Sequence, residues 1–216
     1  SVQLETKATS DNHQNTTHIA ILDKEGNRVS ATMTVNYIFG SSVIAEGTGV
    51  LLNDEMDDFS SKTGEKNVFG IVGSEQNAIA PGKRPVSYMT PTFLEMPGRV
   101  AILGTPGGSR IPSMVLISTL LFSEFKGAIS MVSAMRFHHQ YLPDLLQFEP
   151  ETFSQALQNE LREMGYQLMA LKQYYGDMQA ITWDKKLNLI TATSDPRHIG
   201  LATVVANEHG GYGVNH

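Results

Sequence analysis

The sequence predicts a single α+β domain, because three kinds of pattern follow one another along the chain. Alternating apolar and polar residues, which are typical of strands, dominate the first half. An apolar run typical of a buried helix follows at 112–125, and three strand-like runs come after it. At 216 residues the chain is long enough for one domain with a sizeable core, and it shows no internal repeat.

The first two strands are predicted at 17–22 and 28–35, where apolar and polar residues alternate. The Gly26-Asn27 pair between them is typical of a hairpin turn. The stretch before them, 1–15, is polar and carries no such pattern. The folded domain is therefore expected to begin at this hairpin, behind a short leader.

Residues 60–80, rich in Gly, Ser, Lys, Glu and Asn, predict a long loop. A loop of that length inside a compact domain is usually functional or disordered, so we interpret it as a candidate lid. The helix at 112–125 is apolar nearly all round and should be buried. Gly165 is expected to end a later helix, at 150–164. The other elements are predicted as strands at 49–52, 92–96, 100–103, 167–172, 178–183 and 188–192 and helices at 128–135 and 150–164.

The bulk composition excludes several classes of protein. A hydrophobic content of 41% with 18% charged residues fits a globular protein and not a disordered one. A net charge of −6 without a basic cluster argues against nucleic-acid binding. The absence of cysteine excludes disulfides, thiolate metal sites and cysteine nucleophiles. The longest apolar stretch, 114–122, is too short to span a membrane.

A hydroxyl residue, Thr16, stands where the polar leader meets the first strand. Cleavage between Asn15 and Thr16 would give one residue both a hydroxyl nucleophile and a free α-amine that acts as its base. Such an amine titrates at about pH 8, so a substantial fraction is neutral and can take the hydroxyl proton. Threonine pairs are also common strand formers, so this junction alone does not predict catalysis.

A series of short motifs follows Thr16 in a fixed order, and the series covers nearly the whole chain: TTH at 16–18, TxN at 34–36, MDDF at 56–59, KRPVS at 83–87, GTPGGSR at 104–110, RFHHQ at 136–140 and SDPR at 194–197. Together they closely resemble the small, catalytic subunit of the γ-glutamyltranspeptidase (glutathione hydrolase) family. The resemblance implies the four-layer αββα sandwich of N-terminal-nucleophile hydrolases. It also implies that 1–15 is the end of a large-subunit part, separated by autoprocessing, and that 16–216 is the catalytic domain.

The resemblance assigns the chemistry to Thr16. Its hydroxyl would first attack the Asn15 carbonyl during maturation and later the γ-amide of a donor such as glutathione, forming a γ-glutamyl-Thr16 ester. Water, an amino acid or a dipeptide would then accept the acyl group. By the same resemblance Thr34 hydrogen-bonds the nucleophile and Asn36 contacts the substituents of the substrate α-carbon. The residues alone would read as a polar strand edge, with both side chains on one face.

The resemblance also assigns the donor pocket. Asp58, assisted by Glu55, is expected to hold the α-ammonium of the γ-glutamyl group, since a buried ammonium needs an anionic partner. Adjacent carboxylates on a loop are otherwise most often solvated charge. Ser87 is expected to hydrogen-bond the α-carboxylate. Tyr88 stands where many members have a second serine, a departure that leaves room for altered specificity.

Gly107 and Gly108 precede a predicted helix, and in this context we interpret their backbone N–H groups as the oxyanion hole. A bare Gly-Gly pair is more often a turn. Ser109 and Arg110 are expected to brace this loop. Within the lid, Phe69 is the aromatic residue that would close over the glutamyl group, which favours a small donor.

Other conspicuous residues are interpreted as structural. Neighbouring His138 and His139 point in different directions and have no third ligand at metal-binding spacing, so we predict no metal and no cofactor. Asp195 and Arg197 of the SDPR motif are expected to form a buried ion pair or a turn brace. His18 is expected to pack or to orient its neighbours, because the amine already fills the role of base.

The expected partner is the large subunit of the same precursor, which in the family contributes an arginine to carboxylate binding. The resemblance places the protein in the periplasm or outside the cell. Three alternatives stay open: a glutaryl-cephalosporin acylase, a poly-γ-glutamate depolymerase, and an unprocessed relative that binds without catalysis. Asp58 argues against the first, the lid argues against the second, and Tyr88 keeps both open.

Overall fold

The computed structural model describes residues 16–62, 64–65 and 72–205. The leader 1–15 with Asn15, and Phe69 of the candidate lid, lie outside the described residues. In chain order the strands and helices are β1 Thr16–Leu22, β2 Arg28–Thr34, β3 Thr92–Met96, β4 Arg99–Gly104, α1 Ile111–Ser123, α2 Ala128–Ser133, β5 Phe137–His138, β6 Leu146–Phe148, α3 Gln155–Glu163, β7 Leu168–Ala170, β8 Gln179–Asp184 and β9 Leu189–Ser194. Short 3₁₀ helices lie at Glu55–Asp58 (η1), Glu75–Asn77 (η2) and Gly108–Arg110 (η3).

The predicted hairpin at the start of the domain is confirmed. β1 pairs with β2 in antiparallel register, so that Thr16 lies opposite Thr34 and Leu22 opposite Arg28. The turn is held by the Asp23 carboxylate, whose Oδ1 accepts from the backbone N–H of Asn27 at 2.8 Å. This register places the first residue of β1 beside the last residue of β2.

The strand predicted at 49–52 is wrong. The chain makes only an isolated bridge there, between Ile44 and Leu51. Gly47 and Gly49 on either side of Thr48 adopt φ angles of 74° and 71°, in the left-handed region where a strand cannot continue. The apolar residues that suggested a strand belong to a loop.

A four-stranded antiparallel sheet in the order β3-β4-β8-β9 forms the centre of the molecule. Its strand β4 is buried on both faces, since 100–103 are at most 2% exposed. Ala101 and Leu103 belong to the hydrophobic core formed with α1 and α2. Because side chains alternate along a strand, Val100, Ile102 and Gly104 face the opposite way, toward the β1–β2 hairpin.

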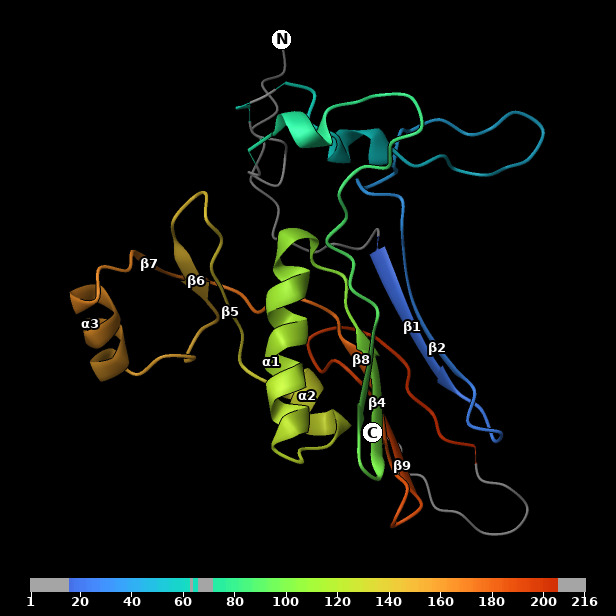
Figure 1. Cartoon of the computed structure of the whole chain (residues 1–216), viewed down its shortest axis with the longest axis vertical. Helices are drawn as coiled ribbons and strands as arrows, with labels where there is room; N and C mark the ends of the chain where they lie inside the picture. Colours follow the sequence, from blue (N-terminus) through green and yellow to red (C-terminus); the bar gives the residue numbers. More distant parts are fainter. Residues whose placement is uncertain (1–15, 63, 66–71, 206–216) are drawn as a thin grey trace.

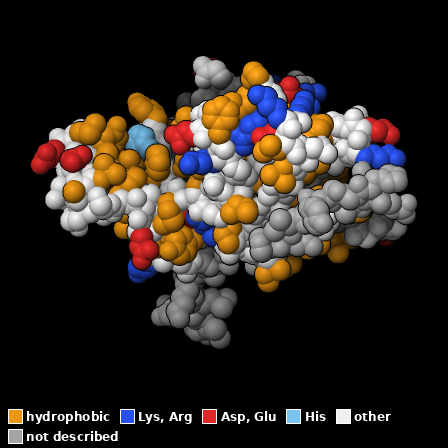
Figure 2. Space-filling view, turned by 90° about the horizontal axis from the view of Figure 1, so that it is seen from below, with side chains coloured by type: hydrophobic (Ala, Val, Ile, Leu, Met, Phe, Trp, Pro, Cys, Tyr) orange, Lys and Arg blue, Asp and Glu red, His pale blue; other side chains and the backbone are white. Residues whose placement is uncertain are grey.

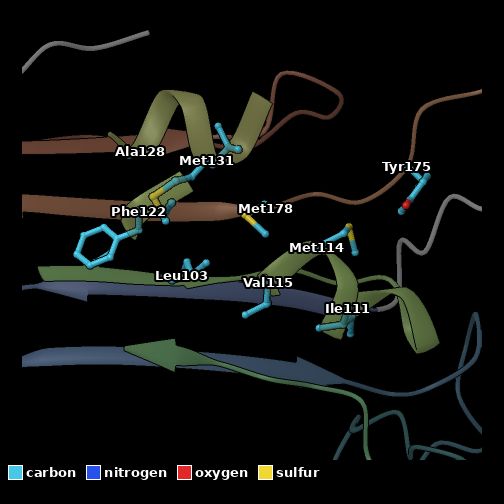
Figure 3. Packing of buried hydrophobic residues seen from close by; sticks show 12 residues of the cluster. Leu103, Ile111, Met114, Val115, Phe122, Ala128, Met131, Tyr175 and Met178 are labelled. Carbon is cyan, nitrogen blue, oxygen red and sulfur yellow. The ribbon is translucent and has the colours of Figure 1, made fainter. Parts of the chain in front are cut away.

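The core lies between α1, α2 and the central sheet. Figure 3 shows Met114, Val115 and Phe122 of α1 gathered with Leu103 and other core side chains on this side of β4. Burial of such apolar surface contributes about 25 cal/mol per Å² to the stability of the fold. The expectation that the whole surface of α1 is buried was wrong.

The outer face of α1 is open within the described residues. Leu116 and Leu120 are 59% and 57% exposed, because only the opposite face of the helix packs on the sheet. Figure 2 shows hydrophobic side chains in several separate patches on the face seen from below.

The layers run in the order helices, four-stranded sheet and two-stranded hairpin, as Figure 1 shows (α1 and α2, then β4 and β8, then β1 and β2). These are three successive layers of an αββα sandwich, and the α+β class is confirmed. A three-stranded sheet, β5-β6-β7, lies with α3 to one side of α1. Strands β5 and β6, of two and three residues, were not predicted.

Candidate active site

The two threonine hydroxyls at the open end of the hairpin are in direct contact. Thr16 Oγ1 lies 2.8 Å from Thr34 Oγ1, as the cross-strand register requires. Thr34 Oγ1 also accepts from the backbone N–H of Asn36 at 2.8 Å. The Asn36 N–H therefore fixes the Thr34 side chain, and Thr34 in turn orients the Thr16 hydroxyl.

Asn36 does not lie on the strand, contrary to the expectation that Thr34 and Asn36 share one face of it. β2 ends at Thr34, and Asn36 adopts φ 69°, a left-handed conformation that asparagine tolerates better than most residues. Its buried side chain donates from Nδ2 to the Asp54 carbonyl at 3.4 Å. This turn connects the hairpin to the segment that carries the carboxylates.

A small pocket brings together nearly all of the predicted site residues that the structure describes. Its volume is about 40 Å³, enough for about one water molecule. Of the predicted residues it is lined by Thr16, Thr34, Asn36, Glu55, Asp58, Ser87, Tyr88 and Gly108. The sequence motifs did not single out Met89 and Ile111, which complete the lining; each is an apolar residue directly beside a motif residue or the helix start.

The carboxylates of Glu55 and Asp58 lie together because they are three residues apart on the 3₁₀ helix η1, where such positions eclipse. Burial is the main cause that raises the pKa of Glu55 to about 7, and the charges of Asp58 and Asp54 add to it. Burial likewise raises the pKa of Asp58. Within the described part of the chain, the buried Oε1 of Glu55 has no hydrogen-bond partner. The pair can therefore accept a hydrogen bond from a cationic ligand.

Ser87 and Tyr88 form the wall near these carboxylates. Ser87 Oγ accepts from the backbone N–H of Met89 at 3.3 Å. The Tyr88 phenol is half-buried, and burial together with the charge of Asp58 raises its pKa. The phenol is thus neutral near pH 7 and can donate a hydrogen bond into the pocket.

Gly107 and Gly108 form the turn between β4 and α1. Gly107 has φ 147° and Gly108 has φ 56°, and a Cβ on Gly107 would lie 2.5 Å from Met114 Cε. The conformation of Gly107 therefore requires glycine, and the left-handed conformation of Gly108 favours it. Gly108 lines the pocket with Thr16, whereas Gly107 does not.

The Arg110 side chain braces this turn, as expected. Its Nη2 donates to Gln147 Oε1 at 2.7 Å, and its guanidinium lies 4.7 Å from the centre of the Tyr175 ring. Its backbone N–H donates to the Gly107 carbonyl at 3.1 Å. The turn is thus tied to the body of the domain through Arg110.

The SDPR and RFHHQ motifs meet in the interior. Arg136 pairs with Asp195, and Arg197 pairs with Glu149 at 2.8 Å and with Asp195 at 3.2 Å. His138 hydrogen-bonds through both ring nitrogens: Nδ1 lies 2.8 Å from Ser113 Oγ and Nε2 lies 2.9 Å from Gln140 Oε1. The contact with Ser113 ties β5 to α1. The residues that the structure describes contain no group of His, Asp and Glu suited to a metal ion. They also contain no helix long and apolar enough to cross a membrane.

Comparison with known proteins gives consistent matches. The sequence model of the family described as gamma-glutamyltranspeptidase matches residues 2–205. A glutathione hydrolase proenzyme of Pseudomonas aeruginosa is 45% identical over 197 residues, which are 89% of this chain and 35% of the relative. The glutathione hydrolase proenzyme of Escherichia coli is 41% identical over 190 residues, 85% of this chain and 32% of the relative.

A solved gamma-glutamyltranspeptidase from Pseudomonas nitroreducens, in complex with L-DON, has a TM-score of 0.77 at 44% identity, and the match covers 88% of this chain and 100% of that chain. The structural likeness confirms the N-terminal-nucleophile hydrolase type of fold. The chain spans about a third of the length of the curated relatives it matches. On the family match and these identities, the chain belongs to the gamma-glutamyltranspeptidase family.

Proposed function

We propose that the chain is the catalytic part of an enzyme that transfers or hydrolyses γ-glutamyl groups, with Thr16 as nucleophile. The observation that carries the proposal is the 2.8 Å contact between the Thr16 and Thr34 hydroxyls in a pocket shared with the Glu55–Asp58 pair. A nucleophile and an ammonium-binding group within one small pocket are what a γ-glutamyl donor requires.

The leader must first be cleaved before Thr16. The Thr16 hydroxyl attacks the Asn15 carbonyl carbon, the Asn15–Thr16 amide nitrogen leaves as the new α-amine, and water releases the resulting ester. The free amine then takes the hydroxyl proton when Thr16 Oγ1 attacks the γ-carbonyl of a donor. In this maturation and in turnover, Thr34 keeps the hydroxyl aimed at the carbonyl through the contact described above.

The acyl transfer then proceeds in two halves. The tetrahedral oxyanion is stabilised by the backbone N–H groups of Gly107 and Gly108. As it collapses, the C–N bond breaks, the Thr16 amine gives its proton to the leaving nitrogen, and a γ-glutamyl-Thr16 ester remains. Water, or the amino group of an amino acid or dipeptide, attacks this ester, and the Thr16 oxygen leaves with a proton from the amine.

The donor is selected by its α-carbon substituents. The α-ammonium would lie between Asp58 and Glu55, where the unpartnered Glu55 Oε1 can accept a hydrogen bond from it. Asn36 contacts the same substituents, and Ser87 and Tyr88 donate to the α-carboxylate. A phenol in place of a short hydroxyl at position 88 alters the space available on that side of the donor.

The remaining expectations concern the rest of the precursor and the candidate lid, of which 63 and 66–71 lie outside the described residues. The rest of the precursor would supply the large subunit and its arginine, covering apolar surface such as that on α1. The segment 60–80, with Phe69, would close over a small donor such as glutathione. We also infer a periplasmic or extracellular enzyme that needs no metal or cofactor.

The test is release of a chromogenic amine from L-γ-glutamyl-anilide by the full-length precursor. We expect turnover that a dipeptide stimulates, and intact-mass analysis should show cleavage before Thr16. Replacing Thr16 by Ala should abolish both, whereas Thr17→Ala at the neighbouring exposed residue should preserve both. A Thr16→Ala precursor that still matures would contradict the mechanism.

Glutaryl-anilide, which lacks the α-ammonium, separates the alternatives. The wild-type enzyme should prefer the γ-glutamyl donor, and Asp58→Asn should reduce that preference by about tenfold or more, mainly through KM. Equal turnover of both donors by a correctly cleaved enzyme would favour an acylase with another donor. An uncleaved, inactive wild-type precursor would favour the binding relative.

A further inference from the structure

The imidazole of His18 lies between the nucleophile strand and the central sheet. His18 is two residues after Thr16 on β1, so the two side chains project from the same face of the strand. The side chain is buried at 5% exposure. It is directed toward the end of β4, the strand that leads into the Gly107–Gly108 turn.

Hydrogen bonds hold the ring from the hairpin side. His18 Nδ1 lies 2.8 Å from Thr32 Oγ1, the residue directly opposite it in the β1–β2 register. His18 Nε2 lies 3.5 Å from Ser30 Oγ, and that hydroxyl donates to the Leu103 carbonyl at 3.1 Å. The ring is thus fixed to β2, and β2 is fixed to β4.

The ring rests on bare backbone at Gly104. A Cβ at Gly104 would lie 2.8 Å from His18 Nε2. It would lie even closer to Cε1 and Nδ1 of the same ring, so it would clash with all three atoms. The φ angle of Gly104 is not in the left-handed region, so the residue is needed there for space and not for its conformation. A side chain of any size at position 104 must therefore displace the His18 ring or the hairpin that carries it.

The same contact keeps charge away from the nucleophile. Burial lowers the pKa of His18 to about 4, so the ring is neutral near pH 7. A neutral ring does not repel a protonated Thr16 amine two residues away or perturb its titration. His18 therefore acts in packing and geometry, and not as a proton carrier.

We propose that His18 and Gly104 form a spacer that sets the distance between the Thr16 hydroxyl on β1 and the oxyanion-binding turn after β4. His18 and Gly104 are positioning residues, since neither lines the small pocket. The proposal rests on the proposed function of Thr16 and the Gly107–Gly108 turn. A displacement of about 1 Å at such a site can cost on the order of 100-fold in rate.

A double-mutant cycle in the full-length precursor tests the spacer. Gly104→Ala should lower kcat on L-γ-glutamyl-anilide by about 10- to 100-fold while KM changes less than about threefold, because the ammonium pocket is untouched. In a His18→Ala background, the added methyl group finds the space vacated by the ring. Gly104→Ala should then cost little, so the double variant should be at least as active as Gly104→Ala alone.

Gly127→Ala is the matched control, because no atom lies within 4 Å of a Cβ built there and its φ is −94°. It should leave kcat unchanged. His18→Asn keeps a neutral hydrogen-bonding side chain and should still fold. It should lower kcat by a larger factor than that by which it changes KM. The same double-mutant cycle can be measured from the melting temperatures of the wild type, both single variants and the double variant. This measurement does not depend on activity, so it still tests the contact if Gly104→Ala folds poorly.

The outcomes separate the two proposals. An active wild type in which the effects of Gly104→Ala and His18→Ala simply add, in rate and in melting temperature, overturns the spacer. Coupled melting temperatures with an unchanged kcat in Gly104→Ala would show a contact without a positioning role, which also overturns it. A wild type that is cleaved but releases no amine overturns the proposed function, while the melting temperatures still decide whether the contact exists.

Discussion

The protonation of the Glu55 carboxyl changes the charge of the pocket near pH 7. Its pKa of about 7 in the folded chain lies above the ordinary value of 4.5, chiefly because of burial. The folded protein therefore retains a proton that the unfolded chain releases, and this contribution to stability, complete below pH 4.5, is lost as pH rises toward 7. The proposed binding of a donor ammonium would have the opposite preference, because an ammonium is best held by two ionised carboxylates.

This opposition predicts a pH-dependent affinity for donors. As pH rises from about 6 to about 8, KM for L-γ-glutamyl-anilide should fall by up to about tenfold, because Glu55 ionises over that range. In Glu55→Gln the amide cannot ionise, so KM should change little with pH over the same interval. Initial rates across this range give KM separately from kcat, which also follows the Thr16 amine. A wild-type KM that does not change with pH would contradict the assignment.

At the scale of the element, helix α3 shows how a single cap sets a boundary. The sequence predicted a helix at 150–164, but the observed helix begins later, at Gln155, and ends at Glu163. Ser154 is its N-cap, with Oγ accepting from the Leu157 backbone N–H at 3.2 Å. The serine cap therefore places the first turn five residues later than predicted.

Removing this cap should destabilise the first turn of α3 locally. Ser154→Ala is expected to cost about 1 kcal/mol of helix stability, because it leaves the Leu157 N–H without its partner. Faster hydrogen exchange at that amide would report the loss, while the rest of the chain should be unaffected. Ser154→Asp keeps an acceptor at the cap and should restore protection. Equal exchange in Ser154→Ala and wild type would show that the cap contributes nothing.

At the scale of the whole molecule, a buried ionic cluster joins segments that are distant in sequence. Arg136 follows α2, Glu149 follows β6, and Asp195 and Arg197 follow β9. Glu149 and Asp195 are at most 1% exposed, and both accept from arginine side chains and from backbone N–H groups. Removing one member leaves a buried charge without compensation.

Asp195→Asn should therefore lower the free energy of unfolding by about 3–5 kcal/mol, because Arg136 keeps its buried charge but loses its ionised partner. Denaturant titration of the assembled protein measures this. The exposed pair between His139 and Asp144 is the control, since Asp144→Asn should cost less than about 1 kcal/mol. Similar losses in the two variants would contradict a structural role for the buried cluster.

Much of the site could be predicted from local signals in the sequence. Alternation and the Gly26-Asn27 turn predicted the hairpin, and its register alone brings Thr16 opposite Thr34. The motif residues from Asn36 to Gly108 were predicted by family resemblance, and the structure gathers nearly all of them into one pocket. Their catalytic and binding roles stay predictions.

The sequence by itself determined the α+β class and the first hairpin, because turn chemistry and hydrophobic periodicity act between neighbours in the chain. Its ordered motifs supplied the candidate residues through the family resemblance. Only the tertiary structure decided which apolar surfaces are covered, as the open face of α1 and the false strand at 49–52 show. It also decided that His18 rests on Gly104 and that a Glu55 oxygen is buried without a partner. Burial and close approach depend on segments far apart in sequence, and no local pattern records which of them will meet.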